Sequence, residues 1–173
     1  MPTLVEIAPY DPNWPRDFSS AETVLRLILG ASVVAVDHVG STAIPGMPAK
    51  PIIDIDITLS SLAAVPSTSG KLIDASYEPR GNRYDDDVWA FILKSSAPTL
   101  RVYLCPPQNR THERRVMFRD YLRNHGEAAE AYSTLKKQLA ARFPYDGDRY
   151  TAEKSMFVQE IVDRAQTERS WPH

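Results

Sequence analysis

Residues 33–59 read VVAVDHVGSTAIPGMPAKPIIDIDITL, and this stretch decides the fold. The β-branched run at 33–36 predicts a strand that ends at the turn 38–41. Proline and glycine in residues 43–51 predict a loop. Residues 52–59 alternate apolar and acidic side chains with the period of two that a strand shows. The stretch therefore predicts two strands joined by a loop, with carboxylates on one face of the second strand.

Asp54 and Asp56 are the two acidic residues of that second strand. Side chains two residues apart in a strand point to the same face and lie roughly 6 to 7 Å apart. Carboxylates at this spacing could hold one or two divalent cations, and their oxygen atoms suit magnesium. The alternative is the solvated outer face of an antiparallel strand, which also alternates in polarity.

Gly40, Ser41 and Thr42 follow the first strand. A glycine after a strand lets a phosphate approach the backbone, while amides and hydroxyls donate hydrogen bonds to its oxygens. Taken alone, a Gly-Ser turn is more often an ordinary loop, but beside two carboxylates it indicates a metal and phosphate site. Lys50 could bridge a phosphate to Asp54, or form an ordinary ion pair at the end of the strand.

The rest of the chain shows strands first and helices last. Apolar residues at spacings of three and four predict a first helix from about residue 14 to 28, and residues 60–77 are expected to be helical in part. Two further strands are expected over 88–94 and 100–105. From about residue 110 the pattern is helical, with several apolar faces. Such an order is typical of an α+β fold whose helices pack on the sheet within one domain.

Basic and imidazole side chains outside the central stretch offer further candidates. Arg115, Arg119 and Arg123 lie on one face of the first helix of the helical half, where they could meet phosphate or be solvated. His38 precedes the Gly-Ser turn and could act as a base, or form a structural hydrogen bond. His112 shows no evident partner and is expected at the surface.

Bulk composition narrows the class of protein. The 173 residues are 43% hydrophobic and 24% charged, as in an ordinary globular domain, and the net charge is -2. That balance ranks nucleic acid below small molecules as a partner. The single cysteine, Cys105, excludes an intrachain disulfide and fits a reducing compartment. No apolar stretch approaches the length of a membrane span and no basic leader precedes an apolar run, so a cytoplasmic protein is expected.

The strings HVGSTAIPG at 38–46 and AKPIIDI at 49–55 resemble the GrpB family, which is itself similar to the polymerase-beta-like nucleotidyltransferase superfamily. The likeness covers nearly the whole chain. It implies a mixed nucleotidyltransferase-like sheet in a single domain over 1–173, sheet-rich over about 1–107 and helical over about 108–168. In the superfamily pattern, the strand acids hold magnesium and the Gly-Ser turn binds terminal phosphates. Lys136 and Lys154 match family positions and could line the same cleft.

The sequence departs from that pattern at the third acid, which the superfamily carries on a later strand. The corresponding strand reads LRVYLC over 100–105 and has no acid. Residues 85–87, DDD, are possible substitutes, or a solvated turn. The leading hypothesis is therefore a protein that binds a metal-nucleotide or another phosphorylated ligand and transfers a nucleotidyl group to an acceptor. The alternatives are a non-catalytic accessory module, as in GrpB relatives joined to a dephospho-CoA kinase, and a small-molecule enzyme with a repurposed cleft.

Overall fold

The computed structural model describes residues 3–170, and its centre is one five-stranded sheet of order β1-β2-β5-β4-β3. The strands are β1 Val33–Val39, β2 Ile52–Leu59, β3 Glu78–Asn82, β4 Trp89–Leu93 and β5 Thr99–Cys105. β2 and β5 pair in parallel, whereas the other neighbours pair antiparallel. The expected mixed sheet of an α+β fold is therefore confirmed.

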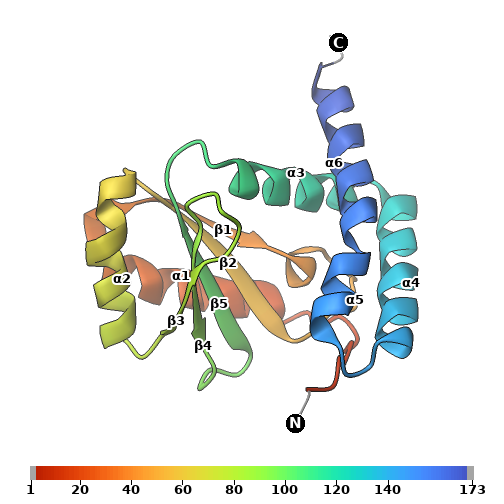
Figure 1. Cartoon of the computed structure of the whole chain (residues 1–173), viewed down its shortest axis with the longest axis horizontal. Coiled ribbons are helices and arrows are strands. Elements are labelled where there is room, and N and C mark those ends of the chain that lie inside the picture. The colour runs from red at the N-terminus through yellow and green to blue at the C-terminus, as the bar shows by residue number, and fades with distance from the viewer. Residues whose placement is uncertain (1–2, 171–173) are drawn as a thin grey trace.

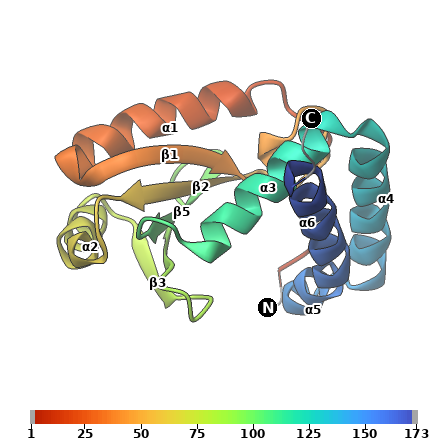
Figure 2. The same ribbon diagram turned by 90° about the horizontal axis from the view of Figure 1, so that it is seen from above.

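Within residues 3–170, six α-helices lie around the sheet (Figures 1 and 2). They are α1 Trp14–Leu29, α2 Val65–Asp74, α3 Arg110–Asn124, α4 Gly126–Arg142, α5 Gly147–Glu153 and α6 Ser155–Ser170. α1 and α2 pack on one face of the sheet, α3 crosses the other face, and α4, α5 and α6 stand at one end. Within residues 3–170, no helix is both long and apolar enough to cross a membrane.

The main core lies between the sheet and the helices α1 and α2. The four side chains of β2 that face this core are fully buried: Ile53, Ile55, Ile57 and Leu59. They pack with apolar residues of β5 and of the two helices. Because successive side chains of a strand alternate between faces, this burial turns Asp54 and Asp56 to the opposite face of the sheet.

A second core joins α3, α4 and α6 to the loop between β1 and β2. Ile44 and Met47 of that loop are buried among side chains of the three helices, which include Phe118, Tyr132 and Ile161. The ammonium of Lys136 on α4 donates a hydrogen bond to the carbonyl of Pro48, and Ala49 pairs with Ala8 through two backbone hydrogen bonds. The loop is thus tied to segments that are distant in sequence.

Two elements differ from the pattern expected of the sequence. α2 runs without interruption through Pro66, which lies in the first turn, where a missing amide proton leaves no hydrogen bond unmade. β3 was not expected, because its sequence EPRGN holds a proline and a glycine and all five residues are exposed. Such residues are tolerated in β3 because it is an edge strand, with β4 as its one neighbour.

Candidate functional site

The turn after β1 lies directly against Asp54. Val39 pairs with Asp54 across the two strands, and Gly40 then adopts φ +74°, a conformation that favours glycine. A Cβ atom on Gly40 would lie 2.7 Å from Oδ2 of Asp54, closer than real contacts allow. Gly40 is therefore required both by its backbone conformation and by the space that the carboxylate occupies.

The next residues of the turn are fixed by hydrogen bonds to both strands. The Thr42 hydroxyl donates to the carbonyl of Ile52 (3.2 Å), and it lies 2.9 Å from Nε2 of His38. Since the hydroxyl proton of Thr42 is used on Ile52, the His38 ring is the donor, through Nε2–H. This pair of side chains fixes the Gly-Ser turn at the carboxyl-terminal end of β1.

A cleft of about 670 Å³ opens beside this turn, between the sheet and α5. Its wall contains six basic side chains and two acidic ones. The basic residues are Lys50, Arg80, Arg83, Arg101, Lys136 and Lys154, and the acidic residues are Asp54 and Asp148. This excess of positive charge in a concave site favours an anionic ligand.

Three lysines of the cleft have lowered pKa values because they are buried close to other cations. The pKa is about 8 for Lys154 and about 7 for Lys136, through burial first and repulsion from neighbouring lysines second. Burial and the charge of Arg101 also lower the pKa of Lys50. The ammonium groups of Lys50 and Lys154 lie 4.8 and 4.2 Å from the ring centre of Tyr150. A bound anion would relieve this repulsion.

Asp54 is the acid of β2 that faces the cleft. Burial raises the pKa of its carboxyl, and the charges of Arg101 and Arg115 oppose that rise. Oδ1 is buried and has no hydrogen-bond partner among residues 3–170, while Nη1 of Arg101 lies 3.5 Å away from it. A buried polar atom without a partner is rare in folded proteins and indicates a role beyond packing.

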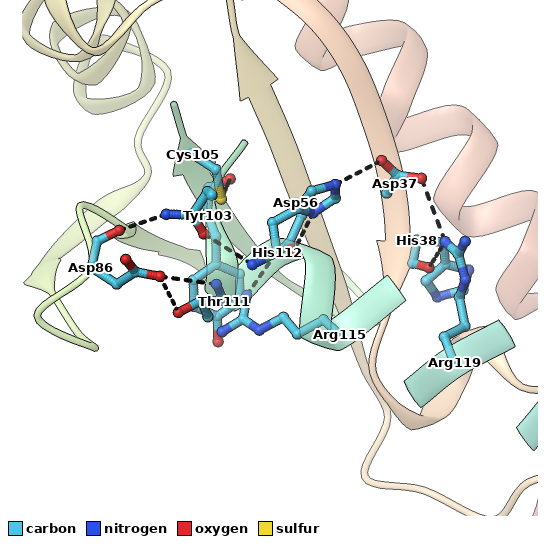
Figure 3. A network of polar contacts seen from close by, with 11 residues as sticks. Asp37, His38, Asp56, Asp86, Tyr103, Cys105, Thr111, His112, Arg115 and Arg119 are labelled. Carbon is cyan, nitrogen blue, oxygen red and sulfur yellow. Dashed lines mark hydrogen bonds and ion pairs between the residues drawn. The ribbon is translucent and has the colours of Figure 1, made fainter. Parts of the chain in front are cut away.

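Asp56 lies within a network of ion pairs that docks α3 on the sheet (Figure 3). The side chain is fully buried, with Oδ1 2.6 Å from Nη1 of Arg115 and Oδ2 3.0 Å from Nδ1 of His112. The other ring nitrogen of His112 lies 3.5 Å from Asp37, which also pairs with Arg119. The three α3 residues have spacings of three and four, so they share one helix face.

The metal-binding capacity of the two acids follows from these contacts. Both oxygens of Asp56 are engaged by α3, and Oδ1 of Asp54 is beside a guanidinium. Within residues 3–170, no group of three or more His, Cys, Asp or Glu side chains is placed to hold a metal ion. As arranged, these residues do not fit a magnesium ion shared by two carboxylates, because the opposing charges are already supplied by arginine.

The residues expected at the site lie in three places. Those that line the cleft are Ser41, Thr42, Lys50, Asp54, Lys136 and Lys154, and Gly40 lies behind the Asp54 carboxylate. Asp56 lies beneath α3, outside the cleft wall. His38, Arg119 and Arg123 line a separate hollow of about 420 Å³, together with Thr42. Thr42 therefore separates two concave surfaces.

His38 and the two arginines support the turn from this second hollow. Burial, and then the charges of Arg123 and Arg119, lower the pKa of His38 to about 4, so the ring is neutral at pH 7. It stacks on Phe18 with a centre-to-centre distance of 4.8 Å. Arg119 donates to the carbonyl of His38 (3.0 Å) and Arg123 to that of Ala43 (2.8 Å).

Several residues of the site were missed by sequence reasoning. The expectation that His112 lies at the surface without a partner is wrong, because it bonds Asp56 and its side chain is 16% exposed. The spacing from His112 to Arg115 and Arg119 was the available signal. Asp86, from the acidic turn, accepts hydrogen bonds from the amide and hydroxyl of Thr111 and so caps α3.

Comparison with known proteins places similar chains in several bacteria. The sequence pattern of the family described as GrpB protein matches residues 4–164. UPF0157 protein YqkA of Bacillus subtilis is 35% identical over 93% of this chain and 47% of its own length. Glutamate-rich protein GrpB of Alkalihalophilus pseudofirmus is 33% identical over 92% and 94%. A dephospho-CoA kinase of Mycolicibacterium paratuberculosis is 32% identical over 93% of this chain and 46% of its length. This chain therefore spans about half of two of these relatives.

Solved structures show the same fold. The crystal structure of GrpB from Enterococcus faecalis has a TM-score of 0.85 and 28% identity, over 95% of this chain and 99% of that one. The Cid1 poly(U) polymerase with Mg 3′-dATP bound has a TM-score of 0.55 and 15% identity, over 79% of this chain and 44% of that one. The fold is thus similar to that of nucleotidyltransferases.

Proposed function

The chain belongs to the GrpB family, and on that premise we propose that it binds a nucleotide or another phosphorylated small molecule in the cleft beside Gly40. The observation that carries the proposal is the charge of the cleft wall, where six basic side chains face two acidic ones. Burial first, and repulsion from neighbouring lysines second, lower the pKa values of Lys136 and Lys154, and a bound anion would stabilise their charged forms.

The phosphate groups would meet the turn and the lysines around it. The Ser41 hydroxyl, the backbone of the turn, Lys50 and Lys154 supply donors from different sides of the cleft. A volume of about 670 Å³ lies within the range of about 300 to 1,000 Å³ that is common for small-molecule sites. Tyr84, half exposed at the cleft wall, offers a ring on which a nucleotide base could stack.

Transfer of a nucleotidyl group is the second candidate function. The close approach of Gly40 to Asp54 and the fold shared with Cid1, which was solved with a magnesium-bound nucleotide analogue, favour it. In this reaction Asp54 and Asp56 would hold magnesium, which would neutralise phosphate charge. That role requires Asp56 to leave Arg115, since the pair is buried at 2.6 Å. His38 would act as base only from outside the cleft wall.

A non-catalytic accessory role is supported by a relative. A dephospho-CoA kinase shares this sequence region over less than half of its length, so a phosphorylated ligand suits a chain that binds without transfer. Release of pyrophosphate separates the two roles: release that depends on Asp54 and Asp56 would exclude a purely binding role.

The binding proposal is tested by calorimetric titration with ATP and with inorganic tripolyphosphate. Lys154→Ala should weaken both by about tenfold or more, because a hydrogen bond to a charged group contributes about 1.5 to 3 kcal/mol. Lys137→Ala is the matched control, since Lys137 is an exposed α4 residue outside the cleft wall. No saturable binding of either probe, or equal losses in the two variants, would refute the proposal.

A further inference from the structure

Arg101 lies where the nucleotidyltransferase pattern expects a third acid. β5 runs parallel to β2, and its register places Arg101 beside Asp54 and Tyr103 beside Asp56, on the same face of the sheet. Nη1 of Arg101 is 3.5 Å from Oδ1 of Asp54, and the arginine side chain is 38% exposed toward the cleft. A cation from the protein therefore faces the acid at a position where a further carboxylate would help to hold a metal ion.

Arg115 forms the corresponding ion pair with Asp56. Its guanidinium is 2.6 Å from Oδ1 of Asp56, and it lies over the rings of Tyr103 and Tyr84 at 4.0 and 4.9 Å. The carboxylate is fully buried and the arginine side chain is 20% exposed. Two aromatic rings and a buried acid hold this guanidinium in one place, which distinguishes it from a mobile surface pair.

We propose that Arg101 and Arg115 take the place of metal cations in this chain, so that the cleft binds the polyphosphate part of its ligand without magnesium. The inference rests on the proposed binding function. A metal ion on both carboxylates would have to displace Arg115 and leave a guanidinium buried without its acid, which is costly. With the acids already neutralised by Arg101 and Arg115, Lys50 and Lys154 are available to the phosphates.

Magnesium then has a defined effect on binding. A magnesium ion chelated by a polyphosphate cancels part of its negative charge, and the cleft attracts the ligand through that charge. The free polyphosphate should therefore bind as tightly as its magnesium complex, or more tightly. A site that needs the metal would show the opposite order.

The first experiment titrates the wild-type protein with tripolyphosphate at constant ionic strength, in EDTA and in excess MgCl₂. The expected affinity is equal or higher in EDTA. A gain of about tenfold or more in MgCl₂, equivalent to about 1.4 kcal/mol, that disappears in Asp54→Asn would overturn the inference. No binding in either solution would refute the proposed function instead, and the second experiment then decides whether arginine fills the metal positions.

The second experiment measures binding of Mn²⁺ alone by electron paramagnetic resonance, with no phosphate ligand present. The wild-type protein should bind no Mn²⁺ at millimolar concentration, whereas Arg101→Asp should gain one site that is lost when Asp54→Asn is added. Arg80→Asp makes the same change of charge at the cleft wall, beside Glu78 and not beside Asp54, so Asp54→Asn should not change any Mn²⁺ binding by that variant. A wild-type Mn²⁺ site that Asp54→Asn removes, or a folded Arg101→Asp variant without a gained site, would overturn the inference.

Discussion

Replacing Gly40 by alanine tests the contact on which the site is built. Two separate costs are expected. The backbone at φ +74° and ψ -174° lies in a region that is essentially restricted to glycine, and it disfavours any residue with a Cβ by about 1 to 3 kcal/mol. The added methyl group would also lie 2.7 Å from Oδ2 of Asp54, and overpacking of this kind adds about 1 to 3 kcal/mol. The free energy of unfolding should therefore fall by about 2 to 6 kcal/mol in total.

Gly46→Ala separates the two costs. Gly46 lies in the same loop with φ +76°, but an added Cβ there would meet no atom within 4 Å. The free energy of unfolding of Gly46→Ala should fall only by the backbone cost of about 1 to 2 kcal/mol. Urea denaturation monitored by circular dichroism gives both values, and Gly40→Ala should cost more than Gly46→Ala.

A double-mutant cycle with Asp54→Ala completes the test. Removing the carboxylate removes Oδ2, so the excess cost of Gly40→Ala over Gly46→Ala should shrink when Asp54 is alanine. Equal costs for the two glycine variants would refute the close approach. An excess that persists without the carboxylate would assign it to another neighbour of Gly40.

Three further predictions concern charged groups. Arg115→Met should lower the free energy of unfolding by about 3 to 5 kcal/mol, because it leaves buried Asp56 without its cation. Arg26→Ala, in an exposed i,i+4 ion pair, should cost less than about 1 kcal/mol in the same urea titrations. Comparable losses in the two variants would contradict this prediction. The pKa of His38 is lowered from 6.5 to about 4, so the unfolded chain binds more protons between these values. The contribution of His38 to the free energy of unfolding should be complete above pH 6.5 and be lost as the pH falls toward 4. In His38→Gln, the free energy of unfolding should therefore fall less steeply between these pH values. The pKa of Lys154 is about 8, so the affinity for tripolyphosphate should fall as the pH rises through 8. Lys154→Arg stays charged, so calorimetric titrations of this variant should show a smaller fall. An unchanged pH profile would exclude Lys154 from the phosphate contacts.

The fold could be predicted from the sequence where local patterning decides it. The alternation over Ile52–Leu59 gave the strand, its buried face and the common direction of Asp54 and Asp56. The Gly40 turn could be recognised because a glycine after a strand is a local feature. These predictions needed no knowledge of which segments meet in space.

The partners of the acids could not be predicted in this way. Arg101 reaches Asp54 only because β5 pairs with β2 in one register, and Arg115 reaches Asp56 across 59 residues of sequence. A helix face of arginines looks the same in sequence whether it is solvated or docked on buried carboxylates. The cations that pair with Asp54 and Asp56 therefore depend on contacts between segments that are distant in sequence.

The loop between β1 and β2 is tied down along its length by Arg123 at Ala43, by Lys136 at Pro48 and by the backbone pair of Ala49 with Ala8. Loops of a dozen residues usually exchange their amide protons early, through small local openings. Here such an opening must also break contacts with α3 and α4, so the amides around Ser41 should exchange together with the helices. The turn proposed to bind phosphate is then already ordered before a ligand arrives, and little conformational entropy would be lost on binding.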